Sequence, residues 1–295
     1  MVNCTLIGCG YWGSILRRYL EGNPNINLVH VCNSKADLNE IWSDKQIPAV
    51  VVATPNDTHY PIVKAALLSG KNVLSEKPLA LKTEQCEELK QIAQDNKLVL
   101  LVNYTYTFSR MLKLAQDMVR KGEIGNILGI EMSVRHLGRF GGGSVYWLLG
   151  SHMLSVLDMF VPLRETTFLR KDLVTYTGTV ETGVISFRNG DISGQIVISL
   201  NYPGKETKII LYGENGTIIY DPEVASPLQI DKYQRIRWTI ASKLPKEHRE
   251  FPHDESNNLR FTVEHFVESI AGRGESNIDR AVNVTRIIET LQQQE

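Results

Sequence analysis

The sequence has 295 residues, which is enough for two domains that each bury a core of their own. Its 32 Lys and Arg residues balance 33 Asp and Glu residues, so no net charge favours nucleic acid or a membrane as a partner. The longest apolar runs have the length of buried strands and are too short to span a bilayer. The N-terminus lacks the basic and apolar segments of a secretory signal, so we expect a cytoplasmic protein. The four cysteines form no Cys-x-x-Cys pair, so we expect neither disulfides nor a metal site.

Residues 1–121 alternate short apolar runs with segments of helical period. The apolar runs predict strands at 2–7, 27–32, 49–53, 72–74 and 98–102. The segments between and after them predict helices at 14–20, 58–68, 83–96 and 109–121. Strands that alternate with helices in this way form a parallel sheet covered by helices. We therefore expect a first domain of doubly wound α/β type that ends near residue 121.

The pattern changes after residue 121, where strands follow one another through Gly, Asn and Asp turns. The predicted strands are 127–136, 167–175, 179–188, 192–199, 207–211 and 217–220. Segments of helical period at 150–160 and 259–293 predict helices packed on one face of that sheet. We therefore expect an α+β domain over residues 122–295, built on a mostly antiparallel sheet. Its open face, expected to be apolar, would be buried against a second copy in a homodimer or homotetramer.

A Gly-x-Gly-x-x-Gly motif lies between the first predicted strand and the first predicted helix. Gly8 permits a tight turn, Gly10 lets a pyrophosphate approach the backbone, and Gly13 lets the helix pack against the strand. The N–H groups that open the helix, at Tyr11 and Trp12, would face the phosphates together with the positive end of the helix dipole. The motif predicts a dinucleotide site of Rossmann type. A glycine-rich turn that binds nothing is the alternative.

Asn33 stands 20 residues after Gly13, at the end of the second predicted strand. A domain that prefers NAD usually carries Asp or Glu there, to bind the adenosine ribose. Asn33 lacks the charge that would repel a 2′-phosphate, and Ser34 and Lys35 follow as donors to such a group. The segment therefore favours NADP(H) over NAD(H). Use of both cofactors, or a solvated loop with no ligand, stays open.

Two further segments read Ala-Thr-Pro-Asn-Asp-Thr-His at 53–59 and Gly-Lys-Asn-Val-Leu-Ser-Glu-Lys-Pro-Leu-Ala at 70–80. With the glycine motif they resemble the glucose-fructose oxidoreductase, inositol dehydrogenase and rhizopine catabolism (Gfo/Idh/MocA) family, closest to its sugar and nucleotide-sugar dehydrogenases. The resemblance covers nearly the whole chain. It implies that NAD(P) exchanges a hydride with a ring carbon of a sugar, cyclitol or nucleotide-linked sugar. The cofactor contacts that it implies in these two segments are Thr54, Pro55, Asn56, His59, Glu76 and Lys77.

Lys77 is the residue that the resemblance places beside the reacting oxygen. A lysine at the carboxyl end of a parallel strand points into the crevice where a cofactor binds. Partial desolvation there lowers its pKa toward values that suit acid-base chemistry. Lys77 could then donate a proton to a ketone oxygen or orient an alcohol. A surface lysine paired with Glu76 is the structural alternative.

The second catalytic element of the family resembles residues 141–153 of this chain. His152 matches the histidine that transfers a proton in the family, and a neutral imidazole can act as a base near neutral pH. Two positions depart from the family pattern. Leu148 replaces the aspartate four residues before the histidine, and Met153 replaces the acidic residue after it. Because leucine can neither accept a proton nor orient an imidazole, the departures weaken the case for catalysis.

Further side chains are candidates for binding a hydroxylated or anionic substrate beside Lys77 and His152. They are Tyr104, Tyr106, Arg135, His136, Arg139 and Trp147. Most of them could equally be buried phenols or solvated charges. Nothing in the sequence separates these two interpretations.

Only 15 residues separate Asn33 from Ala49, where the family usually fits a helix, an edge strand and another helix. One strand-helix unit is therefore missing, and we expect less cover over the adenosine side of the site. Three functions remain open. The chain is an NAD(P)-dependent oxidoreductase, or a dinucleotide-binding sensor that has lost catalytic groups, or a structural partner subunit.

Overall fold

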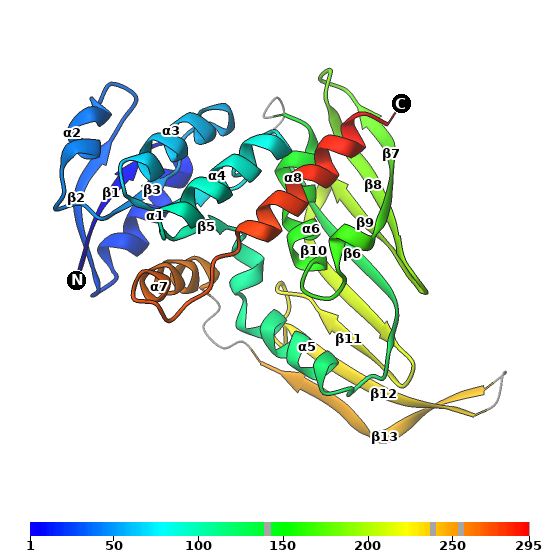
Figure 1. The fold of residues 1–295 in the computed structure, drawn as a ribbon. Helices are drawn as coiled ribbons and strands as arrows, with labels where there is room; N and C mark the ends of the chain where they lie inside the picture. The colour runs from blue at the N-terminus through cyan, green and yellow to red at the C-terminus, as the bar shows by residue number, and fades with distance from the viewer. Residues whose placement is uncertain (139–142, 237–239, 253–256, 295) are drawn as a thin grey trace. The chain divides into compact units, whose positions relative to one another are not determined.

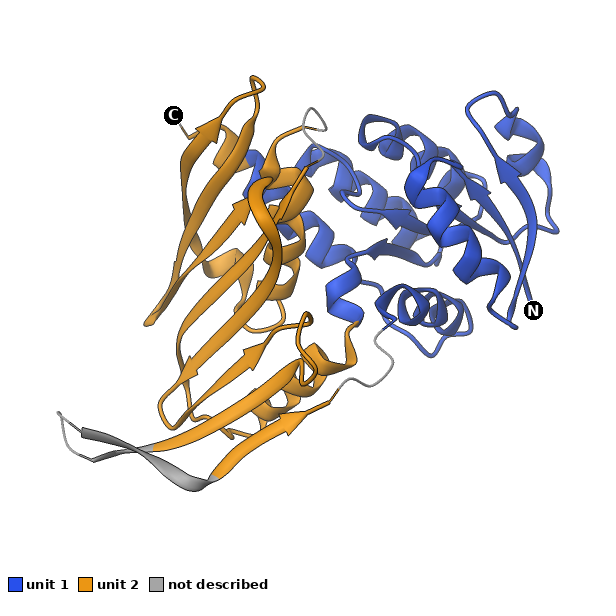
Figure 2. Ribbon diagram, turned by 180° about the vertical axis from the view of Figure 1, so that it is seen from behind, with its two compact units in different colours: residues 1–108, 257–289 blue, residues 109–256, 290–295 orange. Residues whose placement is uncertain are grey.

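The computed structural model describes residues 1–138, 143–236, 240–252 and 257–294. It divides into two compact units, one of residues 1–108 with 257–289 and the other of residues 109–256 with 290–295 (Figure 2). The sequence predicted a single boundary after residue 121, with the whole tail in the second domain. The structure differs because most of the tail packs with the first unit. None of the described helices is long and apolar enough to cross a bilayer.

Unit 1 is built on a five-stranded sheet in the order β2-β1-β3-β4-β5 (Figure 1). All four pairings are parallel, as the sequence predicted. The strands are β1 (Val2–Ile7), β2 (Ile26–Cys32), β3 (Ala49–Val52), β4 (Asn72–Glu76) and β5 (Leu100–Asn103). The helices are α1 (Tyr11–Glu21), α2 (Leu38–Ser43), α3 (Asn56–Leu68), α4 (Thr83–Asp95), η1 (Thr105–Phe108), α7 (Asn258–Ile270) and α8 (Ile278–Gln292), whose last residues belong to unit 2.

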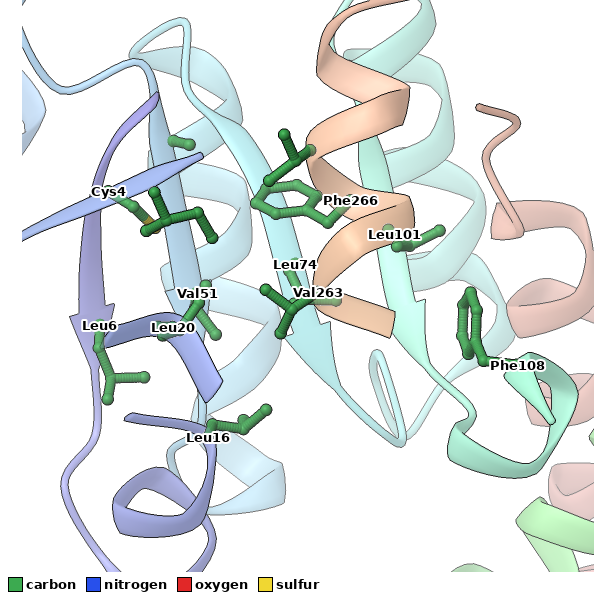
Figure 3. Packing of buried hydrophobic residues seen from close by; sticks show 13 residues of the cluster. Cys4, Leu6, Leu16, Leu20, Val51, Leu74, Leu101, Phe108, Val263 and Phe266 are labelled. Atoms are coloured by element: carbon green, nitrogen blue, oxygen red, sulfur yellow. The ribbon is translucent and has the colours of Figure 1, made fainter. Parts of the chain in front are cut away.

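The tail joins unit 1 because α7 completes its core. Val263 and Phe266 of α7 are at most 1% exposed and belong to the same cluster as Val51, Leu74 and Leu101 of the central strands (Figure 3). Burial of each such side chain contributes about 1.5–3 kcal/mol. Without α7 these strand positions would lose that cover. The apolar face of this helix therefore assigns it to the first unit.

The segment between α7 and α8 closes one edge of the sheet. The Val102 N–H donates to Asn277 Oδ1 over 2.8 Å, and Asn277 Nδ2 donates to the Val102 carbonyl over 2.7 Å. Ser276 Oγ donates to the Leu100 carbonyl over 2.5 Å. These side chains satisfy backbone groups that an edge strand would otherwise leave unpaired.

The opposite edge of the sheet is β2. Residues 33–48 are all described and contain the six-residue helix α2 but no strand, in agreement with the short connection seen in the sequence. Val29 and Val31 of β2 are consequently 40% and 36% exposed. The adenosine end of the predicted cofactor site lies beside this thinly covered edge, since Asn33 follows β2.

Unit 2 contains an eight-stranded sheet in the order β13-β12-β11-β10-β6-β9-β8-β7. All pairings are antiparallel except β6 with β9, so the prediction of a mostly antiparallel sheet is confirmed. The strands are β6 (Ile127–Leu137), β7 (Thr167–Thr175), β8 (Val180–Asn189), β9 (Ile192–Ser199), β10 (Asn201–Gly213), β11 (Gly216–Tyr220), β12 (Leu228–Ile236) and β13 (Ile240–Phe251). The helices are α5 (Arg110–Arg120), η2 (Tyr146–Gly150), α6 (Ser151–Leu157) and η3 (Leu163–Glu165). The last two strands were not predicted.

The two faces of this sheet differ in chemistry. On β6 the buried residues Ile130, Met132 and Val134 alternate with partly exposed polar residues such as Ser133 and Arg135. On the second face Arg135 forms an ion pair with Glu206 of β10 through three hydrogen bonds of 2.7, 2.8 and 3.0 Å. At these positions of β6 and β10 the second face is polar, because the alternation places polar side chains there. Assembly through this face stays a prediction.

A charged group couples β12 to β13. His248 Nδ1 lies 2.8 Å from Asp231 Oδ1 across the strand pair, and His248 Nε2 lies 3.0 Å from Glu250 Oε1. The hydrogen bonds to Glu250 and Asp231 raise the pKa of the imidazole above its ordinary 6.5. The two carboxylates therefore favour the protonated form of His248.

We expect His248 to titrate above pH 6.5 in an NMR experiment on the folded protein, and Asp231→Asn to lower its pKa. A histidine whose pKa is raised by folding stabilises the fold fully below its unfolded pKa, and this contribution disappears as the pH rises through the folded value. Thermal melts of wild type and His248→Gln should therefore differ below pH 6.5 and converge above the folded pKa. Equal pKa values in wild type and Asp231→Asn would contradict the pairing.

Candidate functional site

In unit 1 the residues predicted to bind the cofactor lie along the edge of the sheet that is formed by the carboxyl ends of its strands. Parallel strands all present their carboxyl ends on the same side, where dinucleotides bind in open α/β sheets. The residues that directly follow β1, β2, β4 and β5 are Gly8, Asn33, Lys77 and Tyr104. Thr54 comes two residues after the end of β3. Five separate stretches of chain therefore meet along this edge (Figure 1).

The glycine motif has the geometry of a pyrophosphate cradle. Gly8 has a φ of +101°, and a Cβ added to it would lie 2.3 Å from the Ala53 carbonyl oxygen. A Cβ at Gly13 would lie 2.0 Å from the Gly8 carbonyl oxygen, because α1 packs directly on the turn. A Cβ at Gly10 would meet nothing within 4 Å. Gly8 and Gly13 thus permit the close contacts of the turn, and Gly10 faces open space. The residues of this turn therefore fit a dinucleotide.

Large aromatic side chains flank this open space. Tyr11 and Trp12 are 68% and 46% exposed in the first turn of α1, and their rings meet edge to face at 5.5 Å. No acidic residue occupies that turn, so no negative side chain opposes a phosphate at the helix N-terminus. Their contact with a cofactor stays a prediction.

The loop after β2 is shaped by Asn33. Its Oδ1 accepts a hydrogen bond from the Lys35 N–H over 2.9 Å, which is the Asx turn typical of such loops. Asn33, Ser34 and Lys35 are all exposed. None of these three residues carries a carboxylate that would repel a 2′-phosphate. Their exposure is consistent with the NADP(H) prediction, which no contact tests.

The loop after β3 leads into α3. Thr54 and Asn56 are partly exposed and Pro55 is exposed, so all three remain accessible to a ligand. His59, one turn into the helix, is 0% exposed. Its ring nitrogens are engaged by backbone, with Nδ1 2.7 Å from the Pro78 carbonyl and Nε2 2.8 Å from the Thr54 carbonyl. The prediction that His59 contacts the cofactor directly is therefore wrong, because helix packing directs the ring inward.

Glu76 ends β4 and Lys77 directly follows it, at the same edge. Asn103 Nδ2, at the end of the neighbouring strand β5, donates to Glu76 Oε1 over 2.7 Å. Burial raises the pKa of the Glu76 carboxyl, and the Asn103 bond and the Lys77 charge only partly offset that effect. Asn103 was not predicted, although an amide at a strand end beside a buried carboxyl is a usable signal. Lys77 itself is partly exposed.

The residues predicted to bind the substrate differ in their exposure. Tyr104 is 0% exposed, Trp147 is 7% exposed, and Arg135 is paired with Glu206 on the polar sheet face. The first two are core aromatics, which was the alternative interpretation. Tyr106 and His136 are partly exposed. Arg139, like Gly141 and Gly142 of the second catalytic element, lies outside the described residues.

In unit 2 a π-helical turn, Tyr146–Gly150, runs directly into α6. Within residues 146–157 only Leu148 and His152 are not buried. Residues four apart lie on the same face of a helix, so these two side chains share one surface. The position that carries aspartate in the family is thus a partly exposed leucine, and its role beside the imidazole stays a prediction. Met153 is 0% exposed and cannot replace the missing acid.

Lys77 belongs to unit 1 and His152 to unit 2. Their convergence in one cleft therefore stays a prediction. Among the described residues, no group of three or more His, Cys, Asp or Glu side chains is arranged to hold a metal ion.

The chain is similar in sequence to known proteins. It is 30% identical over 142 residues to the 2,7-anhydro-N-acetylneuraminate hydratase of Mediterraneibacter gnavus. The aligned region covers 43% of this chain and 38% of that protein. It is 25% identical over 243 residues to the levoglucosan dehydrogenase of Pseudarthrobacter phenanthrenivorans, covering 67% of this chain and 61% of that protein. The matched region is thus less than two thirds of either relative.

The fold is shared with solved structures. KijD10, a 3-ketoreductase from Actinomadura kijaniata in complex with TDP-benzene and NADP, matches with a TM-score of 0.82 at 16% identity, covering 99% of this chain and 97% of that chain. A family model described as an oxidoreductase family with an NAD-binding Rossmann fold matches residues 33–104. This region contains Asn33, the loop after β3 and the Glu76-Lys77-Pro78 segment. Over residues 33–104 the chain is therefore similar to the Gfo/Idh/MocA oxidoreductase family.

Proposed function

We propose that the chain is an NAD(P)-dependent oxidoreductase acting on a ring hydroxyl or ketone of a sugar, cyclitol or nucleotide-linked sugar. The observation that carries the proposal is the cradle at Gly10, which is open and lies at the same sheet edge as Lys77. When bound, NAD(P) supplies the hydride donor or acceptor. The named relatives support a carbohydrate substrate, since one is a levoglucosan dehydrogenase and another a hydratase of an anhydro sugar acid.

The residues of the chain then have separate tasks. The backbone around Gly10 and the N-terminus of α1 bind the pyrophosphate. Ser34 and Lys35 bind the 2′-phosphate of NADP(H). One proton passes to the substrate oxygen for each hydride when a ketone is reduced. Lys77 donates this proton, and His152 is the second group proposed for the same transfer. The imidazole acts without an orienting carboxylate, because Leu148 stands in that position.

The proposal predicts that NAD(P) stabilises the protein. In a thermal-shift screen we expect NADP(H) to raise the Tm more than NAD(H), because Lys35 adds a charge-assisted bond to the 2′-phosphate. Absorbance of the reduced cofactor, followed with polyols, sugars and sugar nucleotides, should reveal turnover. Lys35→Ala should remove the preference for NADP(H), whereas Lys45→Ala, another exposed lysine between β2 and β3, should keep it.

The screen also separates the proposal from the second candidate function, a dinucleotide-binding sensor. Leu148 favours that alternative, because it removes a group that orients the catalytic imidazole. A raised Tm with no turnover on any carbohydrate class would support the sensor. No stabilisation by either cofactor would contradict both functions.

A further inference from the structure

The ring of His59 contacts two hydrogen-bond acceptors. Nδ1 lies 2.7 Å from the Pro78 carbonyl oxygen, and Nε2 lies 2.8 Å from the Thr54 carbonyl oxygen. A carbonyl oxygen only accepts hydrogen bonds, and a neutral imidazole has a single N–H. Both contacts are therefore hydrogen bonds only when the ring carries two protons. A neutral ring has to give up one of the two carbonyls.

The two carbonyls belong to the two loops that border the proposed cofactor site. Thr54 packs against the cradle, since its Cγ2 lies 3.0 Å from the Cβ position of Gly8. Pro78 directly follows Lys77. His59 therefore ties the loop beside the pyrophosphate to the segment that carries the proposed proton donor.

We propose that His59 is a proton-dependent positioning residue: the doubly protonated ring holds the Thr54 and Pro78 carbonyls together, and loss of one ring proton releases one of them. The inference rests on the proposed function, because the two loops form one site only if a dinucleotide binds there. His59 acts through these loops and, being 0% exposed, does not touch the cofactor.

The surroundings of the ring set the pH range of this switch. Burial lowers the pKa of His59 below its ordinary 6.5, while the bonds to Pro78 and Thr54 raise it. Lys77 at the end of β4 also lowers it, and Asp57 on α3 raises it. Among the acids of α4, Glu88 is bonded to Lys64 and Tyr60 of α3, and Glu87 is paired with Arg286 of α8. The second proton therefore binds below pH 6.5 in the free protein.

The sign of the effect on binding follows from linkage. If the cofactor prefers the conformation in which both carbonyls are held, its affinity increases as the pH falls through the pKa of His59. By reciprocity, the bound cofactor raises that pKa, and binding near neutral pH takes up a proton. A mechanical role of the ring without titration would give none of these effects.

The first test observes the ring itself and needs no activity. Long-range ¹H–¹⁵N NMR spectra of the histidine side chains, with His59 assigned by its absence in His59→Gln, are recorded between about pH 5 and 8 with and without NADP⁺. We expect both nitrogens of His59 to become protonated at low pH, and the pKa to increase when NADP⁺ is added. A ring that keeps a single proton throughout this range would overturn the inference, even if the cofactor binds.

The second test measures the Kd of NADP⁺ across the same pH range by calorimetry in buffers of different ionisation enthalpy. Wild type should bind about tenfold more tightly at the acidic end and take up a proton, which corresponds to one hydrogen bond from a charged donor. His59→Gln should lose both effects, whereas His30→Gln, at an exposed histidine of β2, should keep them. Titration of the 2′-phosphate is common to all three proteins and cancels.

The outcomes separate the inference from the proposed function. A protein that binds no dinucleotide at any pH contradicts the proposed function and with it the positioning role, whatever the NMR spectra show. A protein that binds NADP⁺ with the same pH dependence in wild type and His59→Gln overturns only the role of His59. A lost pH dependence in His59→Gln together with a doubly protonated ring supports the inference.

Discussion

Gly10→Ala is expected to weaken NAD(P) binding roughly 10- to 100-fold while leaving the free energy of unfolding close to that of wild type. The added methyl group meets no protein atom within 4 Å, and the backbone at Gly10 has a φ of −69°, which alanine adopts without strain. The methyl group would instead occupy the space that a pyrophosphate needs. Forcing an extra methyl group into a packed site costs about 1–3 kcal/mol, which corresponds to the expected loss of affinity.

Gly13→Ala is the matched control for this prediction. A Cβ at Gly13 would lie 2.0 Å from the Gly8 carbonyl oxygen, so α1 would have to move away from the turn. We expect this variant to lose about 1–3 kcal/mol or more of unfolding free energy, as overpacked sites do. Urea denaturation and cofactor titration of both variants give the two readings. If Gly10→Ala binds NAD(P) as tightly as wild type, the open space at Gly10 is not the pyrophosphate site.

Local signals explain why the first half of the chain could be predicted. The glycine motif is contiguous with β1 and α1, so its spacing alone marks the turn between them. Asn33 and Lys77 follow strands whose apolar runs are visible in the sequence, so their place at the carboxyl edge follows from the parallel sheet alone. The lost strand-helix unit was visible as a short loop.

Long-range packing explains what the sequence did not reveal. The helical period of α7 predicts an apolar face that includes Phe266. It does not show that this face packs on the strands of unit 1. Tyr104 was a substrate candidate and His59 belongs to a motif segment, yet the burial of both depends on neighbours distant in the chain. β12 and β13 were missed for a related reason. Charged residues obscure the alternation of apolar and polar side chains, and the β12–β13 pairing shifts register between Asp231 and Tyr233 of β12.

Lys77→Met is expected to lower kcat about 10²- to 10⁴-fold, the usual contribution of a general acid or base, with the Kd of NAD(P) nearly unchanged. Methionine keeps most of the length and apolar stem of lysine but cannot donate a proton. Lys77 lies at the end of β4, two strands away from the β1 turn that contains the cradle, so its loss should spare the pyrophosphate contacts. Stopped-flow absorbance of the reduced cofactor gives the rate, and fluorescence titration gives the Kd.

Lys82→Met is the control, because Lys82 is another lysine near the same strand end but is 61% exposed beside Glu84. It should retain wild-type kcat. Equal turnover in wild type and Lys77→Met would remove the proposed proton donor and leave His152 as the group to test. A large fall in both kcat and cofactor affinity would instead mean that Lys77 contacts the cofactor, as the resemblance implies, or holds the loop whose Pro78 carbonyl contacts His59. The predicted separation of kcat from Kd therefore distinguishes a group that acts on the substrate from one that supports the site.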